Sequence, residues 1–428
     1  MAASIHNTNA NIPDRAVLVS LVLNGENDRL AEESLRELHQ LAETAGVEVK
    51  DTLTQRKEAA DTKWLIGKGK VDELRSMLLA HEANTAIFNR DLSGGQVRNL
   101  EAALDVKIID RTQLILDIFA QRAKTREGIL QVDLAQHNYL LPRLSGHGKN
   151  LSRLGGGIGT RGPGETKLET DRRHIRNRIA DLRRQLTEVT RHRKLHRERR
   201  KKSGVFQVAL VGYTNAGKST LLNRLTKSEV YAENQLFATL DPTSRSMELP
   251  SGREIVLTDT VGFIQQLPHD LVAAFRATLE EVLEADLVLH VVDASSPMRA
   301  EQMRVVDEVL AELGAEGKPR ITVYNKMDLV TQAEKDGELL LRGDDVMNVS
   351  AFSDSDMAEL RSRLEQLLMG GVHSFVLPAE RGDLIALAYR VGDVLDSQTD
   401  EAGVRLRVRV HAQAYERGGH ALDPYMEQ

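Results

Sequence analysis

Residues 206–220 read FQVALVGYTNAGKST, and this stretch decides the fold of the central part of the chain. Its first six residues are an apolar run of strand length, and residues 220–225 continue with helical character. Between them lies the pattern GxxxxGK[ST], which in this setting predicts a loop that surrounds phosphate groups with backbone N–H groups. The helix that follows adds unpaired donors and a partial positive charge at its N-terminus. We therefore expect a P-loop between a strand and a helix.

Two later segments predict the rest of the phosphate site. Asp259-Thr-Val-Gly262 follows an apolar strand at 254–258, which places Asp259 in a metal shell and the Gly262 N–H at the γ-phosphate. The segment Phe237-Ala-Thr-Leu-Asp241 offers the Thr239 hydroxyl as a metal ligand only when a γ-phosphate is present. This segment is the expected mobile switch.

The identity of the base is predicted by Asn325-Lys-Met-Asp328, which follows an apolar strand at 321–324. Guanine presents two adjacent donors that one carboxylate accepts, whereas adenine would leave Asp328 buried and unpaired. Asn325 is expected to support the loops around the base and Lys326 to lie along its face. The short segment Ser350-Ala-Phe352 completes the predicted guanine pocket with backbone N–H groups.

Together these segments predict a Mg²⁺-dependent GTP hydrolase with GTP as substrate and GDP as product. Lys218 and Gly262 are the expected catalytic groups, and Ser219, Thr239 and Asp259 are the expected magnesium ligands. The residues expected to contact the nucleotide are Gly212, Tyr213, Thr214, Asn215, Ala216, Gly217, Lys218, Ser219, Thr220, Phe237, Ala238, Thr239, Leu240, Asp241, Asp259, Thr260, Val261, Gly262, Asn325, Lys326, Met327, Asp328, Ser350, Ala351 and Phe352.

Phe263 stands where Ras-like enzymes carry a glutamine that orients the attacking water. A phenyl ring makes no such hydrogen bond, so we expect slow hydrolysis by the isolated chain. A partner is expected to order the switch around Thr239 or to bring a polar residue such as Gln265 inward.

Upstream of the P-loop, strand and helix patterns alternate. Apolar or alternating runs at 16–23, 47–53, 85–88 and 107–110 predict strands, and helical spacing at 27–45, 71–82 and 94–104 predicts helices between them. This order predicts a small parallel sheet covered by helices. Gly67-Lys-Gly-Lys70 reads as a surface turn or, alternatively, as a phosphate-contacting loop.

A long helical stretch follows, interrupted by the glycine-rich segment 155–164, whose six glycines predict a loop between two helices. The second helix is strongly basic: residues 171–202 hold eleven Arg and three Lys against four acids, a balance of +10, in a chain of net charge −6. Such a block indicates a polyanionic partner, and we favour nucleic acid over a solvated helix of Glu–Arg pairs. Arg191, Arg193, Lys194 and Arg197 are expected phosphate contacts. The loop is either a hinge or a tip that approaches RNA.

Several classes are excluded by composition. The chain has no cysteine, which removes disulfides, zinc-thiolate sites and thiol catalysis. No stretch approaches the roughly 18 apolar residues of a membrane helix, and the N-terminus lacks the pattern of a signal peptide. We expect a cytoplasmic protein without a membrane span, leaving open a membrane-peripheral fraction, and we find no sign of an obligate oligomer.

The motifs also carry a family resemblance. The form FATLDP at 237–242, DTVGF at 259–263, GGGIGTRGPGE at 155–165 and ETDRR at 169–173 resemble the HflX family, a branch of the P-loop GTPases related to translation factors. The resemblance implies a GTPase that binds the large (50S) ribosomal subunit and its RNA and, in some members, splits stalled or stress-idled ribosomes.

The expected fold is α/β, in four parts. An N-terminal α/β domain at 1–123 precedes a basic helical hairpin with a glycine-rich tip at 124–203, then a P-loop GTPase domain at 204–370 and a small α+β domain at 371–428. In the last part a strand at 372–377, a helix at about 380–396 and a strand at 404–410 are expected, with Arg405, Arg407 and Arg409 exposed on an edge strand or meeting RNA. Two rival functions remain: a GTPase serving tRNA modification, ribosome maturation or another RNA assembly, and an RNA-binding protein whose hydrolysis is incidental.

Overall fold

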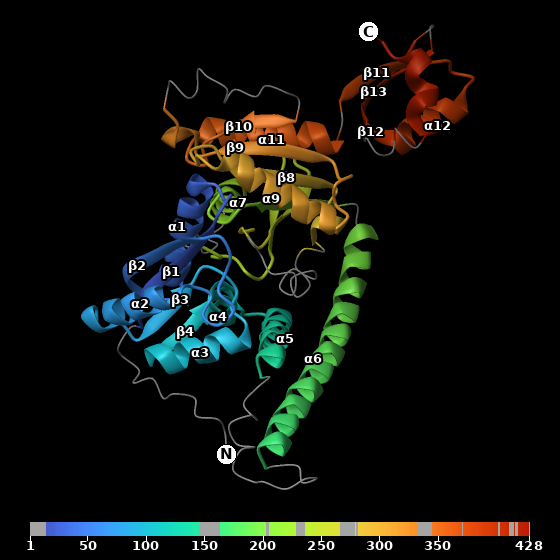
Figure 1. Ribbon diagram of the computed structural model, residues 1–428. Helices are drawn as coiled ribbons and strands as arrows, with labels where there is room; N and C mark the ends of the chain where they lie inside the picture. Colours follow the sequence, from blue (N-terminus) through green and yellow to red (C-terminus); the bar gives the residue numbers. More distant parts are fainter. Residues whose placement is uncertain are drawn as a thin grey trace.

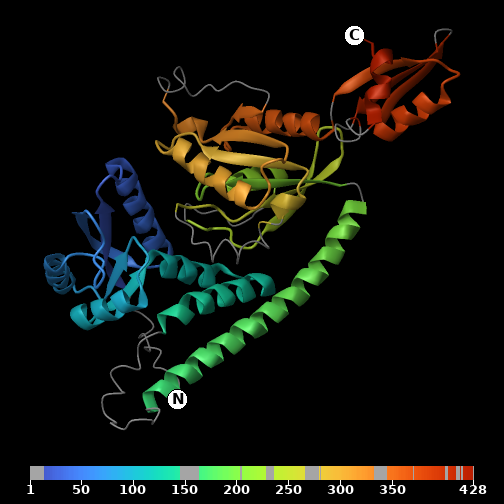
Figure 2. The same ribbon diagram turned by 45° about the vertical axis from the view of Figure 1, so that its right-hand side comes forward.

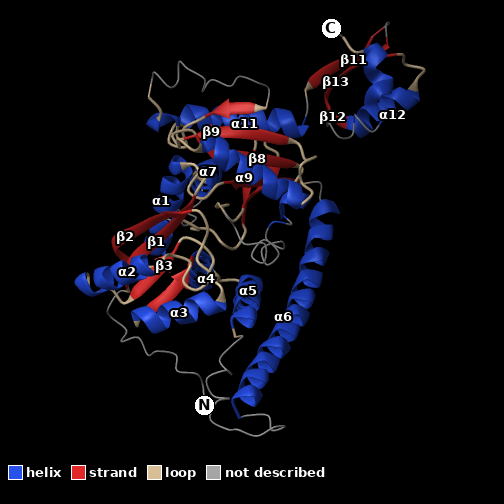
Figure 3. Cartoon of the chain, viewed as in Figure 1, coloured by secondary structure: helices blue, strands red, loops and turns tan. Residues whose placement is uncertain are grey.

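The structure is a computed structural model of the 428-residue chain. It describes residues 14–144, 163–202, 205–227, 236–265, 279, 281–331, 345–369, 371–400, 403–410, 415 and 418–427, without the side chains of 163–168, 192–202 and 400. Within these residues, three β-sheets follow one another along the chain and are covered by helices (Figure 1 and Figure 3). The α/β fold predicted from the sequence is confirmed.

The first sheet is parallel throughout, with the strand order β2-β1-β3-β4. Its strands are β1 (Arg15–Leu23), β2 (Glu48–Lys57), β3 (Thr85–Phe88) and β4 (Lys107–Asp110). Helices α1 (Asp28–Thr44) and α4 (Arg111–Arg122) cover one face, and α2 (Lys68–Ala80) and α3 (Gly94–Leu104) cover the other. Successive apolar residues of β1 alternate between these two cores, as the two-residue period of a strand requires.

The segment Gly67-Lys-Gly-Lys70 differs from its prediction as a surface turn. Helix α2 already begins at Lys68, with Gly67 in extended backbone before it. The Gly67 N–H donates to Gln55 Oε1 at 2.8 Å, and Lys70 pairs with Glu73 one turn further along at 2.8 Å. These contacts stabilise a first helical turn that Gly69 would otherwise disfavour.

Two helices form the hairpin that leads to the second sheet: α5 (Arg126–Arg143) and α6 (Pro163–Lys202), of 18 and 40 residues. Ile179 and Leu182 are buried where α6 packs on α5, and Arg178 of α6 pairs with Asp133 of α5 at 2.6 Å. Residues 155–162 of the glycine-rich segment lie outside the described residues. The helix begins at Pro163, earlier than predicted, because proline is well suited to a first helical turn.

The second sheet has the order β10-β9-β8-β5-β7-β6, in which only β6 is antiparallel to its neighbour. Its strands are β5 (Phe206–Gly212), β6 (Thr243–Glu248), β7 (Glu254–Asp259), β8 (Leu287–Asp293), β9 (Arg320–Asn325) and β10 (Val346–Asn348). Helices α7 (Lys218–Thr226) and α11 (Asp354–Met369) pack on one face, and α9 (Arg299–Glu312) packs on the other. The carboxyl ends of β5, β7 and β9 therefore meet at one edge, where a ligand site is expected.

The first two sheets share one apolar core. A single cluster of buried side chains joins α1 and α4 of the first sheet to Tyr213, Phe237, Leu240 and Phe263, which lie around the carboxyl edge of the second. In Figure 2 the green helix α6 runs from beside the first unit to the second, so the two units are connected by both the hairpin and this core.

The last unit is an antiparallel sheet with the order β11-β13-β12. It consists of β11 (Val372–Leu377), α12 (Gly382–Val391), β12 (Gly392–Asp400), β13 (Gly403–Val410) and the short 3₁₀ helix η3 (Gly419–Tyr425). Two predictions here are wrong. The helix ends at Val391 because the chain continues as β12 in a hairpin with β13, and β13 is the central strand rather than an edge. Arg405, Arg407 and Arg409 therefore belong to a strand that is paired on both sides.

Candidate nucleotide site

The P-loop lies at the carboxyl end of β5, and its two glycines are required by close backbone approaches. A Cβ at Gly212, whose φ is +154°, would come within 2.2 Å of the Val291 carbonyl oxygen. A Cβ at Gly217, whose φ is +95°, would come within 2.3 Å of Asn325 Nδ2. The loop can therefore fold tightly only with glycine at these positions.

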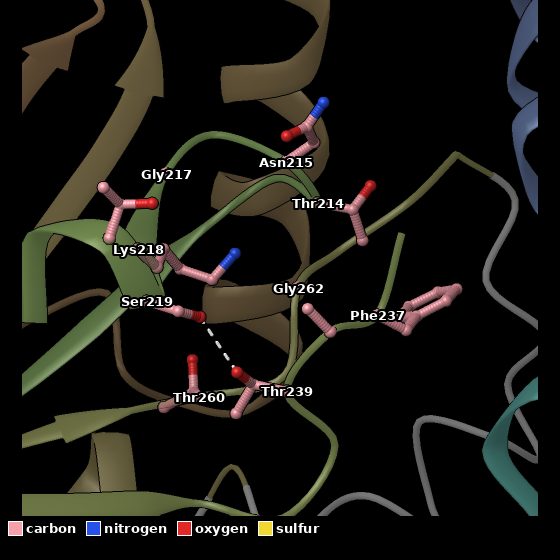
Figure 4. Close-up of a pocket in the computed structure, with 11 residues that line it drawn as sticks. Thr214, Asn215, Gly217, Lys218, Ser219, Phe237, Thr239, Thr260 and Gly262 are labelled. Carbon is pink, nitrogen blue, oxygen red and sulfur yellow. Dashed lines mark hydrogen bonds between the residues drawn. The ribbon is translucent and has the colours of Figure 1, made fainter. Parts of the chain in front are cut away.

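A cleft opens over this loop (Figure 4). Of the predicted nucleotide contacts, the following line it: Thr214, Asn215, Gly217, Lys218, Ser219, Thr220, Phe237, Ala238, Thr239, Thr260 and Gly262. Residues that are far apart in the sequence, in the P-loop, in segment 237–241 and in the segment after β7, are thus brought together around one cleft.

Lys218 is buried beneath the cleft, and its ammonium group is held by the loop itself. Its Nζ donates to the carbonyl oxygens of Gly212 at 3.0 Å and Tyr213 at 2.8 Å. Burial lowers the pKa of Lys218 to about 8, and the nearby Asp259 carboxylate opposes that shift. A buried ammonium group with so few partners is favourably placed to interact with an anion.

The three predicted metal ligands converge at one point. Ser219 Oγ donates to Asp259 Oδ2 at 2.6 Å and lies 2.9 Å from Thr239 Oγ1, the contact drawn in Figure 4. Asp259 is fully buried, and its burial raises the pKa of the carboxyl group although Lys218 lowers it. Within the described residues, Asp259 Oδ1 has no hydrogen-bond partner. A hydroxyl pair and a carboxylate with a free oxygen fit a hard divalent cation such as Mg²⁺, which prefers oxygen ligands.

Gly262 lies directly against the P-loop. A Cβ there would come within 2.8 Å of Thr214 Cα and 3.1 Å of Lys218 Nζ, so any side chain would crowd the phosphate cleft. The approach is fixed by the next residue, since Phe263 N donates to Gly212 O at 3.2 Å and Phe263 O accepts from Thr214 N at 2.7 Å. The Phe263 ring is buried in the core shared by the two sheets, which agrees with its inability to orient water.

The loops predicted to bind the base are tied to one another and to the P-loop. Asn325 Nδ2 donates to Ala216 O at 3.0 Å, and Asn325 Oδ1 accepts from Ala351 N at 3.1 Å. Ser350 Oγ donates to Asp328 Oδ1 at 2.6 Å, which aligns the carboxylate. The supporting role predicted for Asn325 corresponds to these contacts.

Lys326 has a further partner that sequence reasoning missed. Its Nζ lies 2.8 Å from Asp293 Oδ2, and its backbone has a φ of +65°. Asp293 ends the apolar strand β8, as Asp259 ends β7. An aspartate directly after an apolar run was therefore a signal in the sequence that could have identified Asp293.

Other predicted contact residues lie elsewhere. The side chains of Leu240 and Val261 are part of the shared core, and the Asp241 carboxylate is bonded to the start of α5. Phe352 is 74% exposed and does not line the cleft. The Tyr213 side chain points toward α1 rather than toward the phosphates.

Tyr213 connects the P-loop to a buried polar network of the first sheet that no motif indicates. Its hydroxyl contacts Glu37 Oε1 at 2.9 Å, and Glu37 pairs with Arg111 at 2.9 Å. The same hydroxyl accepts from Gln265 N at 2.7 Å, while Gln265 O accepts from Arg111 Nη2 at 3.3 Å. The backbone of Gln265 is therefore held by both units.

Among the residues that the structure describes, no helix is both long and apolar enough to cross a membrane.

A mostly parallel sheet with a P-loop at β5, an aspartate at the end of β7 and the Asn325–Asp328 loop after β9 defines a P-loop GTPase. Comparison with known proteins agrees. Residues 32–120 match the family described as GTP-binding GTPase N-terminal, 122–200 match GTP-binding GTPase Middle Region, and 207–326 match 50S ribosome-binding GTPase.

The chain is 50% identical over 406 residues to the GTPase HflX of Caldanaerobacter subterraneus subsp. tengcongensis, covering 94% of this chain and 92% of that protein. It is 44% identical over 404 residues to the GTPase HflX of Escherichia coli, covering 93% of each. It is also similar to a solved structure described as a complex of SsGBP and GDP, at 25% identity and a TM-score of 0.48, covering 83% of this chain and 98% of that one. The chain belongs to the HflX family of GTPases, and it is a GTP-binding GTP hydrolase.

Proposed function

We propose that this GTPase binds the large ribosomal subunit and its RNA and that it splits or rescues stalled and idle ribosomes under stress. The match of residues 207–326 to a family described as 50S ribosome-binding GTPase supports the partner. The observation that carries the proposal is a row of unpaired arginines on α6.

Arg173, Arg176, Arg183 and Arg191 are exposed, and none of them has an ion-pair partner among the described residues. Their separations are 3, 7 and 8 residues. At 3.6 residues per turn, all four lie within about 80° of arc on one face of the helix. Among the arginines of α6 whose side chains the structure describes, only Arg178 and Arg184 pair with acids, so the alternative of a helix of Glu–Arg pairs is weakened. A continuous basic stripe of this kind suits a phosphate backbone.

In the proposed site, Lys218 contacts the β- and γ-phosphates, and the Gly262 N–H meets the γ-phosphate. Ser219, Thr239 and Asp259 would hold Mg²⁺, which when bound neutralises charge on the phosphates. These assignments rest on the position of Lys218 beneath the cleft and on the convergence of the three oxygens.

Base recognition is assigned to Asp328, with Ser350 aligning its carboxylate. Lys326, held by Asp293, would lie along the base. The backbone of 350–352 would complete the pocket.

The test is cosedimentation of the full chain with purified large subunits in GDP and in a non-hydrolysable GTP analogue, with free tRNA as competitor. Intact ribosomes are then followed on sucrose gradients. We expect binding in the analogue state and release of small subunits. Binding to tRNA instead would favour the rival role in tRNA modification, and bound but intact ribosomes would contradict splitting. Equal RNA affinity in both nucleotide states would favour incidental hydrolysis.

A further inference from the structure

The segment that carries Thr239 also contacts the helical hairpin, two residues further along the chain. Asp241 Oδ2 accepts from the backbone N–H groups of Lys124 and Thr125, both at 2.8 Å. Thr125 Oγ1 donates to the other carboxylate oxygen and accepts from Gly128 N at 3.0 Å. Thr125 is the N-cap residue of α5, so its hydroxyl satisfies one N–H of the first turn while Asp241 holds the N-cap residue itself in place.

This contact is closely packed. A Cβ on Gly128, in the first turn of α5, would come within 2.3 Å of Asp241 Oδ1. Beside it, the ring of Phe237 packs edge-on against Phe119 of α4, with the centroids 4.6 Å apart. Segment 237–241 is therefore docked at one end on α4 and at the other end on the start of α5.

At the other side of the same segment, Thr239 Oγ1 lies 2.9 Å from Ser219 Oγ of the P-loop. Leu240, between Thr239 and Asp241, is 2% exposed and belongs to the shared core. With a buried residue between them, Thr239 and Asp241 have little freedom to move independently, so displacing the carboxylate would also displace the hydroxyl.

We propose that Asp241 is a positioning residue, which holds Thr239 at the P-loop by docking the switch on the N-terminus of α5. The inference rests on the proposed role of Thr239 in the GTP state. Because only the GTP state uses that hydroxyl, the Asp241–α5 contact selects GTP over GDP. By linkage, GTP in turn strengthens the docking of α5, which packs against the basic helix α6. The hairpin thereby links the arginine stripe to the switch.

The variants are Asp241→Ala and Gly128→Ala, each measured for affinity toward GDP and toward a Mg²⁺-bound, non-hydrolysable GTP analogue. Gly128→Ala changes the α5 partner of the contact rather than Asp241. Because alanine favours a helix more than glycine does, the variant displaces Asp241 without unfolding α5. Gly95→Ala in the first turn of α3 is the matched control, because a Cβ there meets no atom closer than 3.9 Å.

Both variants are expected to lower the analogue affinity by roughly fivefold or more while the GDP affinity stays within about twofold. The double variant, Gly128→Ala with Asp241→Ala, should have the nucleotide affinities of Asp241→Ala alone. The added Cβ at position 128 then has no carboxylate to displace. The inference would be overturned if the single variants lost affinity equally for both nucleotides or lost none. It would also be overturned if the losses of the two single variants added in the double variant. Thr239→Ala separates the failure of this inference from the failure of the proposed function. If Thr239→Ala does not lower the analogue affinity more than the GDP affinity, the assignment of Thr239 is wrong. If Thr239→Ala lowers the analogue affinity selectively but Asp241→Ala and Gly128→Ala do not, Asp241 does not position Thr239.

Discussion

On the proposed assignment, Asp328 is the residue that recognises the base. Its carboxylate accepts from Ser350 Oγ and keeps an oxygen for the two adjacent donors of guanine. Asp328→Asn replaces one acceptor by a donor, so GTP affinity should fall by several kcal/mol while xanthosine triphosphate gains affinity. Titration with both nucleotides measures the exchange, with Asp354→Asn, an exposed neighbour that pairs with Arg224, as control. An Asp328→Asn protein with unchanged GTP affinity would refute this assignment.

His290 gives the second residue-level prediction. It is 1% exposed in β8, and burial lowers its pKa to about 4, with Arg320 and Lys218 lowering it further and Asp307 opposing them. Unfolded histidine titrates near 6.5, so between pH 6.5 and 4 the unfolded chain binds the extra proton. The contribution of His290 to the free energy of unfolding should therefore be constant above pH 6.5. It should fall by roughly 3 kcal/mol as the pH decreases from 6.5 to 4.

Chemical denaturation across this pH range tests the effect. Both ring nitrogens of His290 have no hydrogen-bond partner within the described residues, so His290→Leu should remove this part of the slope without leaving an unpaired group. His39→Gln, on the half-exposed face of α1, is the control and should keep the slope. A wild-type profile that is flat between pH 6.5 and 4 would show that His290 does not titrate as inferred.

At the scale of elements, α6 should determine the electrostatic part of RNA binding. Changing Arg173, Arg176, Arg183 and Arg191 together to Gln should weaken binding to large subunits and reduce its salt dependence by about 0.7–0.9 slope units per lost contact. GTP affinity should not change. Of the four residues predicted earlier as contacts, only the Arg191 side chain is among those described; Arg193, Lys194 and Arg197 lie outside them.

The matched control on the same helix is Arg184→Gln. Arg184 is exposed like the others but pairs with Asp181 one turn away, so its loss should change the slope little. If the fourfold variant keeps the wild-type slope, the stripe is a solvated face and another surface carries the RNA contacts.

At the scale of the whole molecule, we predict that hydrolysis depends on a partner, and Gln265 lies at the centre of this prediction. Its backbone is held between the Tyr213 hydroxyl and Arg111, and the Phe263 ring is buried, so neither of these two residues is arranged to orient water. The isolated chain should hydrolyse GTP slowly. Large subunits should raise kcat by about tenfold or more, equivalent to about 1.4 kcal/mol of transition-state stabilisation.

Single-turnover hydrolysis with and without large subunits, at fixed salt and saturating Mg²⁺, measures this activation. Gln265→Ala should bind the nucleotide normally but lose part of the activation if its side chain moves inward. A wild-type rate that is already high, and that the subunits leave unchanged, would mean that the enzyme carries its own water-positioning group.

The sequence alone predicted the parallel first sheet, the mostly parallel second sheet and the residues that line the cleft over the P-loop. Strands β3 and β4 and helix α3 have the predicted bounds, because apolar runs and helical spacing are local properties of the chain. The P-loop glycines and Lys218 were predictable for the same reason, since contiguous residues must adopt one backbone conformation to bind phosphate. Local patterns were insufficient at β12, where pairing with β13 decides between helix and strand. The four-part division by residue number remains a prediction.

Only the tertiary structure decided how the nucleotide site connects to the rest of the molecule. Asp241 lies in the expected switch segment, yet its carboxylate accepts from the N–H of Thr125, the N-cap residue of α5, which is 116 residues away. Tyr213 lies in the P-loop, yet its hydroxyl bonds Glu37 at a separation of 176 residues. A motif specifies backbone geometry and the chemistry of a side chain. The partner of an outward-facing side chain depends on which helix packs beside it, and that packing is set by the core shared between the two sheets.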